Sequence, residues 1–530
     1  MNQKKNALVS PKERIDKAAG TVGVFTFLSR ILGLVRDMVI ANIFGSGIIT
    51  DAFFVAFRIP NLLRRLLGEG SLTIAFIPVF SEYLNRDKRD ALRLANGFLT
   101  IISGLLAIIA ILGIFLAPWI VRIQVYGFGT FSYEYGLTVL LTRITFPYVF
   151  FICLVAFFMG VLNSFKHFAA PAAAPILLNI SIIGAAFLLS PHLSIPIVGL
   201  AIGVLIGGFL QLCLQIPWAL RYGLNIIPSL ASVNHPGIKR IGVLMIPAIF
   251  GSAVYQLNQF IGTLLASFLR DGSISWLYYA DRLVQFPLGV FAISISTAAL
   301  PSLSDHMANN KRDDFREALR HALSLTFFIS IPSIAGLMVL GEPIIMTLFQ
   351  RGAFHYLDTQ NTNYALIFYA MGLWAFSGIR ILVSAFYAMQ DTKTPVKIAS
   401  VALIANLLFS IILMHPLKHG GLALGLSIAS SIQFFLLLFL LRPAIDGSMI
   451  RELARDVLRF CICAFIMAIG IYYLNILFLP VDTGMGIIIQ ASHLALLIIA
   501  GVFIYFLSAK IAGIQETKTF SDMLIKRLLR

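Results

Sequence analysis

Apolar residues run through this chain in long blocks of about 20 to 30 positions, separated by short clusters of polar and charged residues. Each block can cross a hydrocarbon core of about 30 Å as a helix, which satisfies its own backbone N–H and C=O groups. The ten-residue segments of strictly alternating polarity that indicate an outer-membrane barrel do not occur. The pattern therefore predicts an all-α polytopic membrane protein.

The apolar blocks predict fourteen transmembrane helices. Their approximate ranges are 21–45, 51–80, 95–119, 134–162, 169–190, 195–220, 241–268, 274–301, 318–340, 360–389, 395–414, 420–441, 455–478 and 486–509. The composition agrees, because 59% of the 530 residues are hydrophobic and only 12% are charged, against about 25% charged residues in an ordinary soluble domain. This balance excludes a soluble enzyme and a disordered regulator.

The charge distribution predicts the orientation. The chain carries 40 Lys and Arg against 24 Asp and Glu, a formal net charge of +16. With the N-terminus placed in the cytoplasm, 28 of the basic residues fall in inside segments and four in outside loops. By the positive-inside rule, both termini are cytoplasmic. The basic balance is then mostly a matter of topology, and we expect no nucleic-acid partner.

An internal repeat divides the chain at an offset of about 222 residues. In the sixth and twelfth predicted spans, Gly199, Gly203 and Gln211 recur as Gly421, Gly425 and Gln433. Six spans per unit place both halves the same way up, which is a parallel repeat typical of transporters. The predicted organisation is a cytoplasmic segment 1–20, an N-lobe 21–222, a C-lobe 239–442, two extra helices within 451–510 and a cytoplasmic tail 511–530.

Eight basic residues lie inside the predicted spans, and all eight are arginines. They are Arg30, Arg36, Arg58, Arg64, Arg65, Arg143, Arg282 and Arg380. A charge at mid-membrane costs about 3 kcal/mol or more, so such a side chain faces a water-filled cavity or a partner, unless it lies near a helix end and reaches the headgroups. Five of the eight fall in the first two spans, which predicts a cationic cavity that is lopsided toward the N-lobe.

Arginine suits a pyrophosphate or carboxylate ligand, because its planar fork stays charged and donates bidentate hydrogen bonds. Asp37 follows Arg36, and Asp281 precedes Arg282, so each arginine has a candidate counter-ion for the empty site. Gly33 lies between the first two arginines and offers a bending point. The second span supplies further bending points at Pro60, Gly68 and Gly70.

The sequence shows no enzymatic constellation. The nine histidines are scattered, no glycine-rich phosphate loop with a following lysine occurs, and the four cysteines lie in apolar blocks without metal-ligand spacing. We therefore expect no enzymatic activity, no metal and no cofactor. Without a nucleotide-binding domain, a membrane potential or an ion gradient must supply the energy.

Three motifs resemble one bacterial family closely. SRILGLVRD (29–37), TDAFFVAFRIPNLLRRLLGEGSLTIAFIPVFSEY (50–83) and SWLYYADRLVQFPLGV (275–290) are similar to the MurJ (MviN) lipid II flippases of the multidrug/oligosaccharidyl-lipid/polysaccharide exporter (MOP) superfamily. The resemblance spans the whole chain. It implies transport of lipid II, an undecaprenyl-pyrophosphate-linked disaccharide pentapeptide, from the cytoplasmic to the periplasmic leaflet of the inner membrane for peptidoglycan synthesis.

The resemblance also implies roles for particular residues. The essential cavity arginines of the family match Arg30, Arg36, Arg64 and Arg282, and its acidic positions match Asp37, Asp51 and Glu69. We expect Asp37 to join the four arginines in substrate binding. Gating or portal roles are expected for Asp51 and Glu69, and, from the residue pattern described above, for Gly33 and Asp281. The last two spans would form a hydrophobic groove for the lipid tail.

The resemblance leaves the coupling ion open. Some family members have a sodium site built partly from carboxylates, whereas the seventh, eleventh and twelfth spans here contain no Asp or Glu. The membrane potential is therefore the expected driving force, with a monovalent counter-ion as the alternative. We expect a monomer whose partners are lipid II and membrane lipids.

Three other functions remain as alternatives. One is export of another undecaprenyl-linked oligosaccharide. A second is cation-coupled drug antiport, which would favour acidic rather than arginine-rich cavities. The third is a non-transporting scaffold for cell-wall enzymes, which the absence of long soluble segments disfavours.

Overall fold

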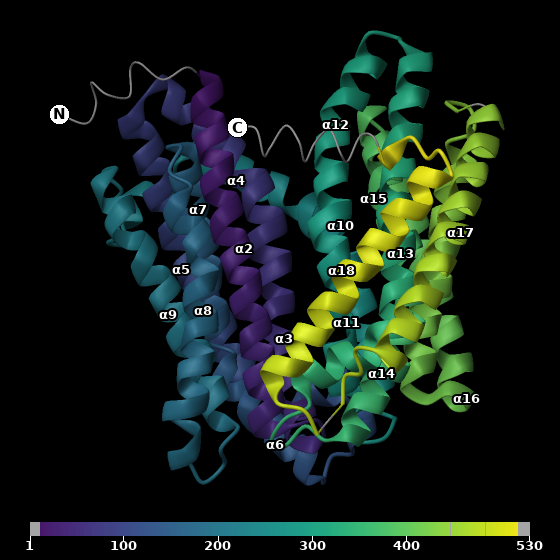
Figure 1. Ribbon diagram of the computed structural model, residues 1–530. Coiled ribbons are helices and arrows are strands. Elements are labelled where there is room, and N and C mark those ends of the chain that lie inside the picture. The colour runs from purple at the N-terminus through teal and green to yellow at the C-terminus, as the bar shows by residue number, and fades with distance from the viewer. Residues whose placement is uncertain (1–10, 446, 483, 518–530) are drawn as a thin grey trace. The chain divides into compact units, whose positions relative to one another are not determined.

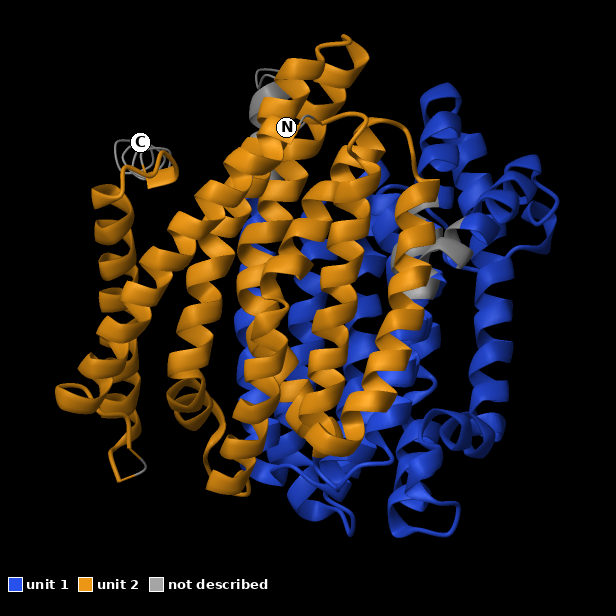
Figure 2. Cartoon of the chain, turned by 90° about the vertical axis from the view of Figure 1, so that its right-hand side faces the viewer, with its two compact units in different colours: residues 1–272 blue, residues 273–530 orange. Residues whose placement is uncertain are grey.

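The computed structural model describes residues 11–445, 447–482 and 484–517, and within these ranges all regular elements are helices (Figure 1). The prediction of an all-α fold is therefore confirmed. The chain forms two compact units, residues 1–272 and 273–530 (Figure 2).

The first unit contains nine α-helices, one π-helix and three short 3₁₀ helices among its described residues. In chain order they are α2 (Pro11–Phe44), α3 (Ile48–Leu63), the π-helix η2 (Arg64–Leu72), α4 (Thr73–Arg86), α5 (Lys88–Gln124), η3 (Tyr126–Phe128), α6 (Tyr133–Thr145), α7 (Tyr148–Ser164), α8 (Ala169–Leu188), η4 (Ser190–His192), α9 (Val198–Arg221), η5 (Leu230–Ser232) and α10 (Pro236–Ala266).

The second unit is built in the same way from long helices. They are α11 (Ser273–Pro287), the π-helix η6 (Leu288–Ala292), α12 (Ile293–Ala308), α13 (Arg312–Phe349), α14 (Tyr356–Met371), α15 (Leu373–Ala388), α16 (Lys393–Leu440), α17 (Gly447–Leu477) and α18 (Ile487–Ile511).

Most residues of every predicted span are helical, but helices and spans do not correspond one to one. α16 covers two predicted spans, because Lys418 leaves helical geometry at φ 51° and ψ −131° and bends the chain. Within the described ranges, nine helical stretches are long and apolar enough to cross a membrane, or ten if α14 and α15, bent by 40°, form one span. The count of fourteen therefore stays a prediction.

The first unit extends past the predicted N-lobe because α10 packs on η2, α4 and α5. A polar contact contributes, since the Arg58 guanidinium on α3 donates to the Thr263 hydroxyl and to the Gln259 carbonyl on α10. Arg58 thus bonds to a neighbouring helix at a buried threonine rather than to solvent alone. The lobes as units of motion, 21–222 and 239–442, remain a prediction.

Glycines let helices approach closely in both units. A Cβ at Gly203 of α9 would lie 2.7 Å from Ala185 Cβ on α8, and one at Gly425 would lie 2.7 Å from Ser410 Oγ within α16. Such small-residue contacts are a main source of helix packing in membranes, where the hydrophobic effect between helices is weak. Because the two glycines are partners in the internal repeat, the same packing solution occurs in both units.

A second shared feature is the π-helix. η2 and η6 occupy corresponding places in the repeat, since Leu288 lies 222 positions after Leu66. π-Helical turns are rare and are found mostly at functional sites, because the inserted residue loosens the regular hydrogen-bond ladder. Their recurrence at the repeat offset supports the division into two related halves.

Candidate functional site

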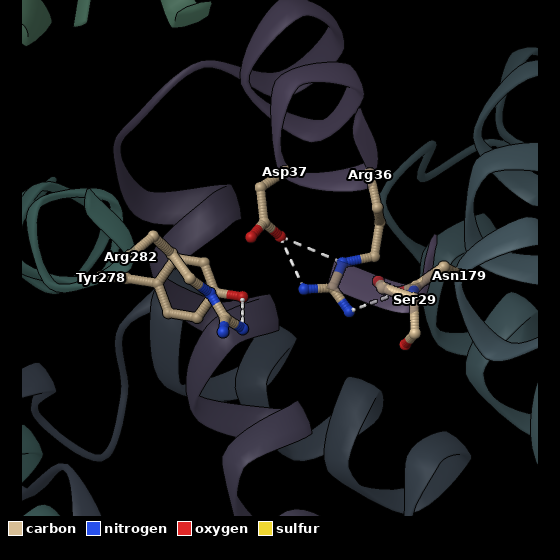
Figure 3. A network of polar contacts seen from close by, with 6 residues as sticks. All are labelled: Ser29, Arg36, Asp37, Asn179, Tyr278 and Arg282. Atoms are coloured by element: carbon tan, nitrogen blue, oxygen red, sulfur yellow. Dashed lines mark hydrogen bonds and ion pairs between the residues drawn. The ribbon is translucent and has the colours of Figure 1, made fainter. Parts of the chain in front are cut away.

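Arg36 and Asp37 on α2 form a buried ion pair, with side chains that are 8% and 2% exposed (Figure 3). The Arg36 Nη2 and Nε atoms both donate to Asp37 Oδ1, at 2.7 and 3.0 Å. A buried guanidinium without a partner would be costly, so the neighbouring carboxylate stabilises it. The expected pairing of these two residues is therefore present.

Asn179 on α8 completes this network. Arg36 Nη1 donates to Asn179 Oδ1 at 3.1 Å, and Asn179 Nδ2 donates to the Ser29 carbonyl at 3.1 Å (Figure 3). The asparagine thereby joins α8 to α2 at two points. Sequence reasoning missed Asn179, although a lone amide in the apolar run APILLNISIIG was a usable signal.

Arg30 and Gly33 take different positions on the same helix. Arg30 is exposed and lies six residues before Arg36. Six residues make about one and two-thirds turns, so the two arginines lie on different faces of α2 and Arg30 does not join the buried pair. Gly33 faces α8, since a Cβ there would lie 3.8 Å from Asn179 Nδ2. The predicted convergence of Arg30, Arg36 and Arg282 remains a prediction.

Arg64, Gly68 and Glu69 all belong to the π-helix η2. Arg64 is half-buried and its Nε donates to Asn61 Oδ1 at 3.2 Å. Gly68 is buried against α7, where a Cβ would lie 3.1 Å from Ala156 Cβ. The Glu69 side chain lies outside the part of the structure that is described.

Asp51 lies in the first turn of α3 and is 2% exposed. Its Oδ2 atom accepts a hydrogen bond of 2.8 Å from the Gly272 backbone N–H. This bond ties the start of α3 to the end of the loop that follows α10. Asp51 thus has a structural contact, and its gating role remains a prediction.

In the second unit, Arg282 and Asp281 lie on α11. Arg282 is exposed, its Nη2 donates to the Tyr278 hydroxyl at 2.6 Å, and its guanidinium lies 4.8 Å from the centre of the same ring (Figure 3). Asp281 accepts a weak bond of 3.4 Å from Gln285. The tyrosine contacts the arginine both through its hydroxyl and through the face of its ring.

The arginines at these positions are suited to an anionic ligand, because a guanidinium stays charged and donates several hydrogen bonds. Within the described residues, no group of three or more His, Cys, Asp and Glu side chains is arranged to hold a metal ion. Arg36 directs two of its nitrogens at one carboxylate oxygen of Asp37. Guanidinium groups bind phosphate oxygens with the same pair of donors.

Comparison with known proteins gives one consistent family. The family described as "Lipid II flippase MurJ" matches residues 40–492. A protein of Vibrio cholerae serotype O1 named "Probable lipid II flippase MurJ" is 40% identical over 440 residues, covering 81% of this chain and 83% of that protein. The "Lipid II flippase MurJ" of Burkholderia cenocepacia is 40% identical over 433 residues, covering 80% and 83%.

Solved structures agree with the sequence relatives. The structure titled "Lipid II flippase MurJ, inward closed conformation" has a TM-score of 0.78 and 29% identity, covering 96% of this chain and 99% of that one. An inward-facing multidrug resistance MATE transporter of the MOP superfamily has a TM-score of 0.67 at 14% identity, covering 80% and 98%. The second likeness shows the fold alone.

Proposed function

The chain belongs to the MurJ family of lipid II flippases, and we propose that it moves lipid II from the cytoplasmic to the periplasmic leaflet by alternating access. Lipid II cannot cross unaided, because its sugars, peptide and pyrophosphate are too polar for a hydrocarbon core. A protein must therefore shield the headgroup while the lipid tail stays in the bilayer or in a groove. We assign that groove to α17 and α18.

The buried Arg36–Asp37–Asn179 network carries this proposal. In the empty protein, Asp37 neutralises Arg36 and Asn179 orients its guanidinium. A pyrophosphate with more negative charge and several acceptor oxygens competes with one carboxylate for the same donors. Binding then replaces an internal partner, so the arginine is never left both buried and unpaired.

Arg30, Arg64 and Arg282 extend this binding surface in the proposal. Arg30 and Arg282 are exposed within their own units, and Arg282 is in contact with Tyr278. A shared anionic ligand would offset the cost of holding several cations in a membrane protein. The convergence of the three arginines Arg30, Arg36 and Arg282 on one cavity follows from this reasoning.

The π-helices η2 and η6 are the proposed flexible points. Each interrupts a predicted span where the regular i to i+4 ladder is already loosened, so a bend there breaks fewer good bonds than a bend within an α-helix. Gly33 and Gly68 add bending points, while Asp51, Glu69 and Asp281 serve the gate or portal. The N-lobe 21–222 would rock against the C-lobe 239–442.

The membrane potential is the proposed driving force, with a monovalent counter-ion as the alternative. The orientation with both termini in the cytoplasm, and a monomeric state, belong to the same proposal. The positive-inside distribution of the basic residues supports the orientation.

The direct test is depletion of the protein in its own cells. Lipid II should then accumulate in the inner leaflet, where a membrane-impermeant enzyme added from outside cannot cleave it. Re-expression should restore cleavage. If lipid II stayed accessible while another undecaprenyl-linked oligosaccharide accumulated instead, the export of that oligosaccharide would be the better assignment.

Alternating access has a separate test by cross-linking. Engineered cysteine pairs that join the two lobes on the periplasmic side should, when oxidised, hold the cavity open to the cytoplasm and stop transport, and reduction should restore it. Continued transport at the full rate with the lobes locked would favour a fixed lipid-scrambling groove.

A further inference from the structure

Three arginines form a row on α17. Arg451, Arg455 and Arg459 are spaced four residues apart, which places them on one face of the helix over about two turns. All three side chains are exposed, and among the described residues none makes a hydrogen bond or an ion pair. The row therefore keeps its positive charge available to a ligand.

The acidic residues of the same segment are engaged elsewhere. Glu452 and Asp456 lie on the neighbouring face and pair with Arg320 of α13, at 3.5 Å and 3.4 Å. Arg455 and Arg459 interact with Asp456 only electrostatically, beyond ion-pair distance. The carboxylates thus fasten α17 to α13, and the arginine row itself makes no ion pair with an acid in the described part of the chain.

An apolar stripe continues the arginine row along the same face. Leu458 lies on that face beside Arg459, seven residues after Arg451. Ile462 and Ile469 continue the face beyond the row, at further spacings of seven residues from Arg455 and Ile462. These three apolar residues are, in chain order, 62%, 54% and 43% exposed. The face is therefore cationic at one end and apolar along the remainder.

A cavity precedes this row in the chain. It has a volume of about 340 Å³ and is lined by Arg442, Ile445, Gly447 and Ile450. The Arg442 guanidinium lies 4.7 Å from the centre of the Phe439 ring and is exposed. The start of α17 therefore offers a fourth cation beside a hollow whose other lining residues are apolar.

We infer that this face of α17 binds a membrane phospholipid with an anionic headgroup. The phosphate would contact the arginine row, and an acyl chain would lie along the apolar stripe. Charge complementarity selects an anionic ligand, and the continuous stripe selects a lipid over a free phosphate. The charge distribution predicts that this end of α17 is cytoplasmic, where anionic lipids favour basic residues. This phospholipid would be a structural lipid, and its binding to α17 does not depend on which substrate the protein transports.

The test uses the full chain, purified in detergent and examined by native mass spectrometry. Phosphatidylglycerol should bind more tightly than phosphatidylcholine with the same acyl chains. In the variant R451Q/R455Q/R459Q, phosphatidylglycerol affinity should fall by about 100-fold at low salt, because each basic residue near an anionic surface contributes about fivefold. R451K/R455K/R459K should keep most of the affinity, which separates lost charge from lost folding.

The matched control removes three exposed arginines from other helices, as R89Q/R93Q/R312Q. It should leave phosphatidylglycerol binding within about twofold of the unmodified protein, since a local row acts at short range. An equal loss in the control would overturn the inference in favour of general surface charge. Displacement of phosphatidylglycerol by millimolar inorganic phosphate, or a row that prefers lipid II, would overturn it as well.

Discussion

Replacing Arg36 by lysine should impair transport far more than the unchanged charge suggests. The guanidinium uses three separate nitrogens, two toward Asp37 and one toward Asn179. A lysine ammonium is a single donor centre and cannot reproduce this fork. Loss of two charge-assisted bonds at about 1.5 kcal/mol each gives about 3 kcal/mol, or about a 100-fold lower transport rate if the same donors hold the pyrophosphate.

The assay is complementation of a flippase-depleted strain, with transport measured by external cleavage of lipid II and protein amount measured in the membrane fraction. Arg143→Lys is the matched control, because Arg143 is an exposed arginine in the last turn of α6. Arg143→Lys should support growth and transport within about twofold of the unmodified protein, as surface substitutions usually do.

The opposite order would refute the reasoning. If Arg36→Lys transported at more than half the normal rate while Arg143→Lys failed, the substrate-binding role of Arg36 would have to be abandoned. If Arg36→Lys reduced the amount of folded protein in proportion to activity, the network would be structural rather than ligand-binding.

Three further predictions concern single positions. Asn179→Leu should lower transport by about tenfold or more, because Arg36 loses a buried acceptor. Ser181→Ala should be neutral, since the Ser181 hydroxyl has no hydrogen-bond partner among the described residues. External cleavage of lipid II measures transport by both variants. Gly203→Ala should destabilise the protein by about 1 to 3 kcal/mol in thermal unfolding, while Gly184→Ala, which meets open space, should be neutral or slightly stabilising. Hydrogen bonds from the side chain and the backbone N–H of Thr394 hold the pKa of Asp391 below its ordinary value. The bonds that Asp391 accepts at the start of α16 are therefore present at neutral pH and are lost as the pH falls through that lowered pKa. The protection of amide hydrogens in the first turn of α16, taken relative to the intrinsic exchange rate at each pH, should therefore fall only under acidic conditions. Unchanged protection in acid would contradict this.

The regular structure of this chain follows from its sequence to a large extent. Long apolar blocks have no other stable form in a bilayer than helices, so the all-α fold could be predicted from composition and spacing. The adjacency of Arg36 and Asp37 likewise predicted their pairing, because residues next to each other in the chain can form a contact without help from the rest of the fold. The internal repeat was visible for the same reason, since it is a property of the residue order.

Other features depend on contacts between distant segments, which a pattern of polarity does not specify. Asn179 lies 143 residues after Arg36, and only the packing of α8 on α2 brings its amide to the guanidinium. The same packing buries Arg36 and leaves Arg30 exposed, although both stood in equally apolar surroundings in the sequence. The π-helical form of η2 and η6 also belongs to the tertiary structure, because whether a turn takes up an extra residue depends on the neighbouring helices that hold it. Local order along the chain therefore determined the helices and their internal ion pair, while the burial of each charge was decided by which helix faces meet.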